Sequence, residues 1–295
     1  MSPFFRKSKG WIALFLAPTV ILFSVIIVIP LFQSFYYSFF EWNGVSTGAF
    51  LGWENYKTLY NARELKISMK NSIIYSLLLT AYQVGLGTLF AFIFANMKIR
   101  GLAFCRNVYF VPVLLSASVV SQLWIWIYHG DYGLINKLSE LIGLEWRQQW
   151  LNRKNSALVA VTIAEAWKGM GYHMLIIYAA MKNIPKDYME ASSIDGATPM
   201  RQFFSITLPC LSPIILFNLI MQLISGFMTF TQAQIITQGG PNYATNYIAL
   251  NIFQEGFAYS HMGYACAQSW VMLLIMAAIT GIIFKTSDNW AFYES

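Results

Sequence analysis

Charged side chains are scarce in this sequence. Of its 295 residues, 11% are Asp, Glu, Lys or Arg, whereas 57% are hydrophobic and 17% are aromatic. Soluble domains carry about 25% charged residues, so this chain has too few charges to cover a water-facing surface. The composition argues against a soluble enzyme or a nucleic-acid-binding protein and predicts that much of the surface faces lipid.

Residues that bind metals or form disulfides are also few. The cysteines and histidines are widely separated in the chain: Cys105, Cys210, Cys266, His129, His173 and His261. Their spacing excludes a disulfide framework and a CxxC metal pair. The sequence also lacks HExxH, a GxSxG motif with a plausible partner, and the phosphate-binding GxxxxGK[ST]. We therefore expect no catalytic residue, no metal and no cofactor in this chain.

The sequence does contain long hydrophobic runs. A transmembrane helix needs ~20 mostly apolar residues, and six segments qualify, at about 11–36, 71–96, 107–128, 156–181, 211–236 and 263–285. The first is too long for the apolar core of a signal peptide and lacks a small-x-small cleavage site, so we expect it to be retained. Pro18 and Pro30 are expected to bend it. The sequence predicts a single all-α membrane domain over residues 1–295.

The basic residues favour one orientation of these spans. An even number of spans puts both termini on the same side. With the N-terminus inside, the inner segments hold Arg6, Lys7, Lys9, Lys98, Arg100, Arg106, Lys182, Lys186, Arg201 and Lys285. Lys and Arg near helix ends mark the cytoplasmic side, so we expect cytoplasmic N- and C-termini. The net charge of +6 then reflects topology and does not require a nucleic-acid partner.

The connection between the fourth and fifth spans, residues 182–209, is unusually structured. Pro185 suits the first turn of a helix over about 186–193, and Gly196 lies where a C′ glycine ends it. Thr198 and Pro199 form the N-cap and N1 pair of a second helix, and Pro209 is expected to interrupt the chain before the fifth span. The pattern predicts a helix–turn–helix that either contacts a cytoplasmic partner or lies on the bilayer surface.

The same segment resembles the EAA motif of ABC-transporter permeases. That motif is EAA, three residues, Gly, nine residues and I-x-L-P. It is matched here by Glu190-Ala191-Ser192, Gly196 and Ile206-x-Leu208-Pro209, with Ser192 for the second Ala as the one departure. The stretches FLGWENYKTLY (50–60) and TQGGPNYAT (237–245) are similar to the carbohydrate-importer branch, which includes the maltose and glycerol-3-phosphate permeases. The resemblance covers about residues 11–285.

This resemblance implies a type I ABC importer permease, with six transmembrane helices and a cytoplasmic coupling helix, in a bacterial or archaeal cytoplasmic membrane. It implies that Glu190, Ala191, Ser192, Asp195 and Gly196 face a cytoplasmic ATPase subunit, which binds the ATP and Mg²⁺. The other implied partners are a second related permease, a second ATPase subunit, an extracytoplasmic solute-binding protein, membrane lipid and a carbohydrate substrate, with oligosaccharides as the expected class. The chain itself is then a translocation subunit and not an enzyme.

Two polar stripes are candidates for the substrate path. In the fifth span the stripe is spaced four, three, four and three residues, which places it on one helical face: Asn218, Gln222, Ser225, Thr229 and Gln232. In the fourth span Glu165, Lys168, Gly169 and Tyr172 recur at spacings of three or four. Amides, hydroxyls and an aromatic ring suit a neutral sugar. Comparison with the maltose permease implies that the sugar-facing positions are Glu165, Gly169, Tyr172, Gln222, Ser225, Gly226 and Thr229.

The residues themselves leave alternatives open. Polar side chains in the fifth span are also typical of hydrogen bonds between helices, and an alternative interpretation of Glu165 and Lys168 is that they neutralise each other. Trp124 belongs either to an interfacial aromatic belt or to a sugar-stacking surface. A self-contained secondary transporter or channel would need inverted repeats and paired intramembrane ionisable groups. An intramembrane enzyme would need a catalytic pair, and neither class explains the EAA pattern.

Overall fold

The computed structural model describes residues 9–96, 100–144, 147–288 and 290–292. The chain divides into two compact units, which are described separately. The first comprises residues 1–62 and 252–271, and the second comprises 63–251 and 272–295. Of the charges used to predict the orientation, Arg6, Lys7 and Lys98 lie outside the described residues.

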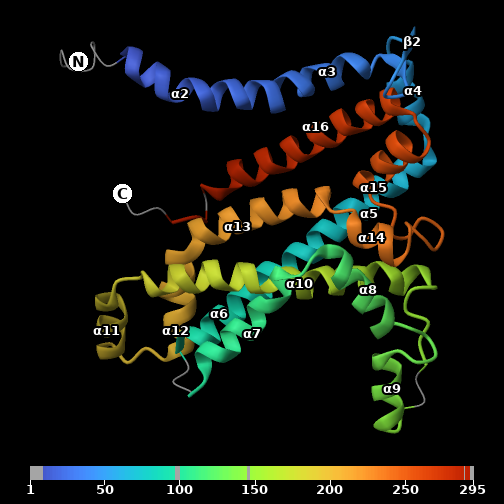
Figure 1. The fold of residues 1–295 in the computed structure, drawn as a ribbon. Coiled ribbons are helices and arrows are strands. Elements are labelled where there is room, and N and C mark those ends of the chain that lie inside the picture. Colours follow the sequence, from blue (N-terminus) through green and yellow to red (C-terminus); the bar gives the residue numbers. More distant parts are fainter. Residues whose placement is uncertain (1–8, 97–99, 145–146, 289, 293–295) are drawn as a thin grey trace. The chain divides into compact units, whose positions relative to one another are not determined.

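The first unit begins with one long apolar helical segment. Helix α2 (Lys9–Phe23), the π-helical turn η1 (Ser24–Val28) and α3 (Ile29–Tyr37) follow one another without a break (Figure 1). Pro18 lies inside α2, and Pro30 lies in the first turn of α3, directly after the π turn. In the most apolar window of this segment no residue is buried. Such a helix presents its side chains to lipid or to another protein.

A short hairpin and a helix follow in the same unit. Strand β1 (Phe40–Trp42) pairs antiparallel with β2 (Thr47–Phe50), and α4 (Glu54–Asn61) comes next. Asn55 of α4 donates from Nδ2 to the carbonyl oxygen of Ser38 at 2.8 Å. The last two residues of α15 (Ile248–Phe253), the π turn η4 (Gln254–Ala258) and the start of α16 (Met262–Ser287) complete the unit. The apolar pattern of the sequence predicted neither the strands nor α4.

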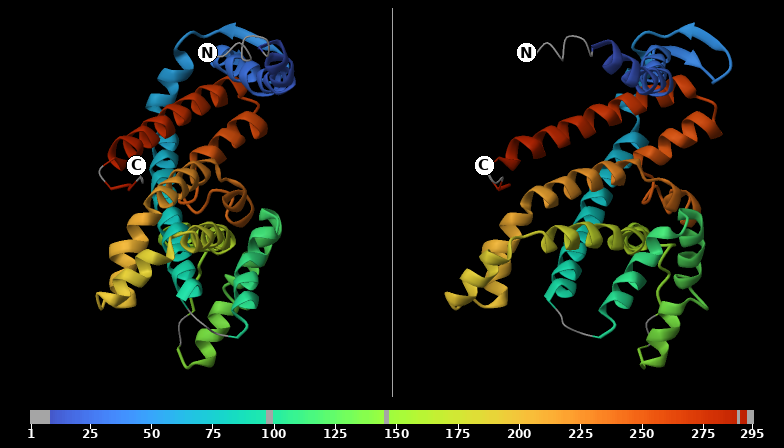
Figure 2. Two further views of the ribbon diagram at one scale, coloured as in Figure 1. Left: turned by 90° about the vertical axis from the view of Figure 1, so that its left-hand side faces the viewer. Right: turned by 60° about the vertical axis from the view of Figure 1, so that its left-hand side comes forward.

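The second unit is a helical bundle (Figures 1 and 2). Its elements are α5 (Arg63–Thr80), η2 (Ala81–Gly85), α6 (Leu86–Asn96), α7 (Leu102–Leu114), α8 (Ala117–Ile127), α9 (Leu134–Leu141), α10 (Lys154–Lys182), α11 (Lys186–Ile194), α12 (Pro199–Gln202), η3 (Phe203–Thr207), α13 (Leu208–Met228), α14 (Thr231–Ile236), α15 (Ile248–Phe253) and the rest of α16. The longest, α10, packs against α6 and α7. Apolar side chains of α6, α10 and α13 form a buried cluster that includes Val84 of η2, Met174 and Ile177.

Several helices of the described chain are long and apolar enough to cross a membrane. Four qualify, at Trp11–Tyr37, Arg63–Asn96, Pro199–Ile236 and Met262–Ser287, and the bent pair α7 and α8 raises the number to five. Helix α10, which contains the predicted fourth span, is 29 residues long but is not among them. Its lower hydropathy follows from Glu165, Lys168 and several small residues. The count of six spans therefore stays a prediction.

The predicted third span is not one straight helix. Helices α7 and α8 meet at an angle of 103°. Pro112 lies near the end of α7, where it removes a backbone donor. Ser116 then begins α8 as its N-cap, accepting from the N–H of Val119 at 3.3 Å. The break is therefore built from a helix stop and a helix start only four residues apart.

The expected interruption at Pro209 is wrong, and the helix is instead interrupted at Thr229, inside the predicted fifth span. Helix α12, η3 and α13 run on without a break from Pro199 to Met228. The π turn η3 ends directly before the first turn of α13, and this widened turn accommodates Pro209, which has no N–H. At the other end, Thr229 has an extended backbone, so α13 stops at Met228 and α14 starts at Thr231.

Candidate functional site

The segment between α10 and α13 folds as a helix–turn–helix. The helix predicted over 186–193 is present as α11. Gly196 adopts a φ of 74°, a left-handed conformation that glycine reaches without strain. Its N–H donates to the carbonyl oxygen of Ser193 at 3.1 Å, and the N–H of Ala197 donates to that of Ser192 at 2.9 Å. These bonds satisfy the last carbonyls of α11, as a glycine C-cap does.

The second helix starts at the predicted cap and is joined to the first. Thr198 accepts from the N–H of Arg201 at 3.4 Å, and Pro199 occupies the first turn of α12. Gln202 of α12 donates from Nε2 to Oγ of Ser192 at 3.0 Å. Ser192, the one departure from the EAA pattern, is therefore buried at the contact between α11 and α12, where an alanine has no acceptor to offer.

The other four residues expected to face an ATPase subunit lie on the surface. Glu190, Ala191, Asp195 and Gly196 are exposed. Large apolar side chains of the same segment are also exposed to solvent. The exposed fractions of Tyr188, Ile194, Met200 and Phe204 are 44%, 87%, 58% and 60%. An apolar and acidic surface of this kind on a short, rigid segment is suited to contact with a protein.

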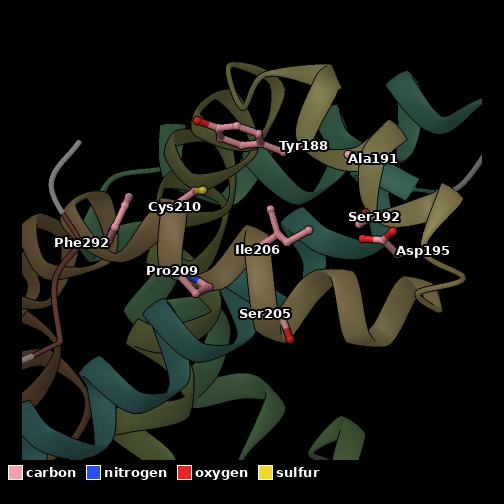
Figure 3. Close-up of a pocket in the computed structure, with 9 residues that line it drawn as sticks. All are labelled: Tyr188, Ala191, Ser192, Asp195, Ser205, Ile206, Pro209, Cys210 and Phe292. Atoms are coloured by element: carbon pink, nitrogen blue, oxygen red, sulfur yellow. The ribbon is translucent and has the colours of Figure 1, made fainter. Parts of the chain in front are cut away.

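A cavity of about 450 Å³ lies beside α11. Figure 3 shows its lining residues, which are Tyr188, Ala191, Ser192, Asp195, Ser205, Ile206, Pro209, Cys210 and Phe292. Phe292 reaches this place from beyond α16, where its N–H donates to Oγ of Ser212 at 2.7 Å. The cavity thus joins α11, the beginning of α13 and the C-terminal segment.

The polar residues of α10 and α13 do not all face one space. Gln222 and Asn218 are buried, and both bind His173 of α10: Asn218 Oδ1 lies 2.7 Å from Nδ1 and Gln222 Oε1 lies 2.9 Å from Nε2. Asn218 also donates from Nδ2 to the carbonyl oxygen of Ile214 at 2.8 Å, which fixes its amide with the oxygen toward the imidazole. His173 is therefore a hydrogen-bonded link between α10 and α13.

Glu165 has partners on two other elements. Its carboxylate accepts from Nε2 of Gln232 on α14, and its carbonyl oxygen accepts from Nε2 of Gln83 at 2.8 Å. Gln83 lies on η2, is 2% exposed, and occupies the space that a side chain at Gly169 would need. Gln232 was expected to continue the face of the fifth span, but the break at Thr229 turns it toward α10.

Of the remaining predicted sugar-facing positions, some are accessible at the surface and one is packed against another helix. Tyr172 is 49% exposed, Ser225 is exposed and Thr229 is half-buried, with its hydroxyl donating to the carbonyl oxygen of Ser225 at 2.8 Å. Gly226 is buried against α5, where an added Cβ would lie 2.9 Å from Oγ of Ser76. The structure therefore brings together Glu165 with Gln232, and His173 with Gln222, while Tyr172 and Ser225 are exposed.

Sequence reasoning did not single out Gln83 or the role of His173. No role was assigned to His173 from the sequence, and the structure shows that it is buried, at 3% exposure. A signal was available, because Gln83 and His173 are polar residues within apolar spans, where such residues usually face another helix. Their partners depend on helix packing and were not readable from spacing.

Comparisons with known proteins identify the family. Residues 6–290 match the model of the family described as "Binding-protein-dependent transport system inner membrane component". The chain is 39% identical over 285 residues to the probable ABC transporter permease protein YesP of Bacillus subtilis, covering 95% of this chain and 91% of that protein. It is 31% identical to the probable starch degradation products transport system permease protein AmyD of Thermoanaerobacterium thermosulfurigenes, covering 94% of each.

A solved structure has the same fold. It is a chain of a bacterial ABC transporter involved in the import of the acidic polysaccharide alginate, with a TM-score of 0.85 and 20% identity over 98% of this chain and 99% of that one. The family and the apolar helices together make this chain a multi-pass membrane protein. It belongs to the family of inner membrane components of binding-protein-dependent transport systems.

Proposed function

We propose that this chain is a permease subunit of an ATP-driven carbohydrate importer and forms the translocation path with a second, related permease. The observation that carries the proposal is the α11–α12 segment, a rigid helix–turn–helix with an exposed EAA-type surface, on a chain of a binding-protein-dependent transport family. The relative named for the transport of starch degradation products supports a carbohydrate substrate. An oligosaccharide delivered by an extracytoplasmic solute-binding protein is the substrate class we favour.

The α11–α12 segment is the proposed contact for a cytoplasmic ATPase subunit. Glu190, Ala191, Asp195 and Gly196 are exposed there, whereas Ser192 supports them from beneath through Gln202. The cavity beside α11 offers room for a side chain of that subunit. Two ATPase subunits, one beneath each permease, would bind ATP and Mg²⁺, so no cofactor is assigned to this chain. This arrangement puts the N- and C-termini in the cytoplasm.

The proposed substrate-lining set keeps all seven predicted positions but gives them different tasks. Tyr172, Ser225 and Thr229 are accessible enough to contact a sugar directly. Glu165, Gly169, Gln222 and Gly226 are packed or hydrogen-bonded against neighbouring helices and would shape the path indirectly. An accessible aromatic ring and hydroxyls suit a neutral, hydroxyl-rich ligand.

Sugar uptake by the assembled transporter tests this function. The full chain, with its permease, ATPase and solute-binding partners, is reconstituted in proteoliposomes and offered a panel of labelled mono- and oligosaccharides. We expect uptake of at least one sugar that needs both the binding protein and enclosed ATP. Uptake that persists without ATP but stops when an ion gradient is dissipated would instead establish a self-contained secondary transporter.

A further inference from the structure

Two cations from different helices converge on one aromatic ring. The guanidinium carbon of Arg106, on α7, lies 5.0 Å from the centre of the Tyr178 ring. Nζ of Lys182, one helical turn further along α10, lies 5.5 Å from the same centre. A ring attracts each cation through its negative face, but it carries no net charge. Both positive charges therefore lie within 5.5 Å of the centre of one uncharged ring.

This cluster lies where several predicted spans end. Nζ of Lys182 donates to the carbonyl oxygen of Ala95, in the last turn of α6, at 3.3 Å. The sequence predicts span ends at residues 96 and 181 and a span start at 107, so Ala95, Lys182 and Arg106 share one membrane boundary. Tyr178 packs on the buried apolar cluster of α6, α10 and α13, which fixes the ring in place.

The charges are not balanced by protein acids. Within the described chain, neither Arg106 nor Lys182 has a carboxylate within 4 Å. Lys182 has three N–H donors, of which one is used on Ala95. Arg106 has five, and no hydrogen bond from its guanidinium to a described residue is formed. The pair is thus a concentration of positive charge with free donors beside lipid.

An anionic phosphate is the ligand that fits this chemistry. Guanidinium and ammonium groups both donate to phosphate oxygens, and a charge-assisted bond to each would also relieve their mutual repulsion. Basic pockets between transmembrane helices at a membrane surface bind anionic lipid headgroups. We propose that Arg106 and Lys182 bind the phosphate of an anionic phospholipid such as phosphatidylglycerol, with Tyr178 as the floor of the site. This inference rests on membrane insertion and not on the proposed sugar transport.

Lipid binding to the purified full-length chain tests the site. Native mass spectrometry in a mild detergent measures binding of phosphatidylglycerol and of phosphatidylcholine with the same acyl chains. We expect the wild type to prefer phosphatidylglycerol and each of Arg106→Gln and Lys182→Gln to weaken that preference about fivefold. Arg106→Lys, which keeps the charge, should retain most of it. Lys285→Gln removes an exposed cation at the end of α16 and is the matched control.

The outcomes separate a defined site from general attraction. Loss of the preference in the Arg106→Gln/Lys182→Gln double variant, with Lys285→Gln unchanged, supports the site. Equal binding of the two lipids by the wild type overturns it, as does an equal loss in Lys285→Gln. Inorganic phosphate is added in a parallel titration, and displacement of the lipid at millimolar phosphate would also overturn a lipid-specific site. Circular dichroism and gel filtration confirm that each variant is folded.

Discussion

Gly171 allows α7 and α10 to approach backbone to backbone. A Cβ at this position would overlap the carbonyl oxygen of Tyr109 and lie 3.0 Å from Cα of Phe110. Both are main-chain atoms of α7, so a rotamer change cannot relieve the overlap. The two helices would have to separate, and their shared apolar packing would loosen.

We expect Gly171→Ala to lower the stability of the folded chain by about 1–3 kcal/mol, the usual cost of overpacking. Thermal unfolding of the purified chain in mild detergent measures the change. Gly281→Ala is the control, because nothing lies within 4 Å of a Cβ there. An unchanged midpoint for Gly171→Ala would show that α7 is free to move away from α10.

Single residues also show where sequence reasoning reached its limit. Ser192 was noted only as the one departure from the EAA pattern, and its small size is compatible with its burial. Its hydrogen bond from Gln202 depends on the turn that brings α12 back beside α11. Likewise, Gln222 lies on the predicted face of α13, yet the identity of its partner, His173, is set by the packing of two helices.

At the scale of the element, local signals were sufficient for the α11–α12 segment. Pro185, Gly196, Thr198 and Pro199 each act within a turn of their own position, through fixed φ, left-handed backbone or capping. The bend between α7 and α8 had similar signals in Pro112 and Ser116, but the apolar run around them concealed it. The π turn before Pro209 had no local signal that the sequence analysis used.

Gly196 provides the test of this element. Its φ of 74° is strained for a β-branched residue by about 1–2 kcal/mol, although no atom lies within 4 Å of an added Cβ. We expect Gly196→Val to distort the turn and abolish sugar uptake by the assembled transporter while the chain remains in the membrane. Co-purification of the ATPase subunits and uptake in proteoliposomes are the two measurements.

Gly143 supplies a matched control for that substitution. It has a φ of 79° and an equally open surrounding, but it lies after α9 and far along the chain from the α11–α12 segment. Gly143→Val should therefore impose the same backbone strain and leave uptake nearly unchanged. If both variants transport at the wild-type rate with normal ATPase association, the coupling role of α11 is rejected.

At the scale of the whole molecule, the low content of charged residues is reflected in two features of the structure. The first apolar segment, Trp11–Tyr37, has no buried residue in its most apolar window, so its stability depends on lipid or a second permease. The few polar groups within the other spans are largely buried in contacts between helices, as at His173 and Glu165. Length and hydropathy were enough to predict a multi-pass membrane protein, but not the bends and the polar contacts.

The transport path is tested at Thr229, because this residue is half-buried at the end of α13 and α13 carries the proposed sugar-facing positions. Gln222→Trp is a poorer test, since Gln222 is buried against His173 and a tryptophan there would disturb packing. We expect Thr229→Trp to block sugar uptake by filling the path, while ATPase association stays at the wild-type level. Uptake and co-purification are measured on the same preparation.

Thr286→Trp is the matched control for Thr229→Trp. Both threonines donate from Oγ1 to the carbonyl oxygen four residues earlier, Thr229 to Ser225 at 2.8 Å and Thr286 to Ile282 at 3.0 Å. Thr286→Trp thus removes the same hydrogen bond and adds the same ring, but at an exposed position near the end of α16. Uptake should survive this control. Equal, unimpaired kinetics in both variants would remove Thr229 from the path, whereas equal loss in both would assign the effect to the helices and not to a blocked cavity.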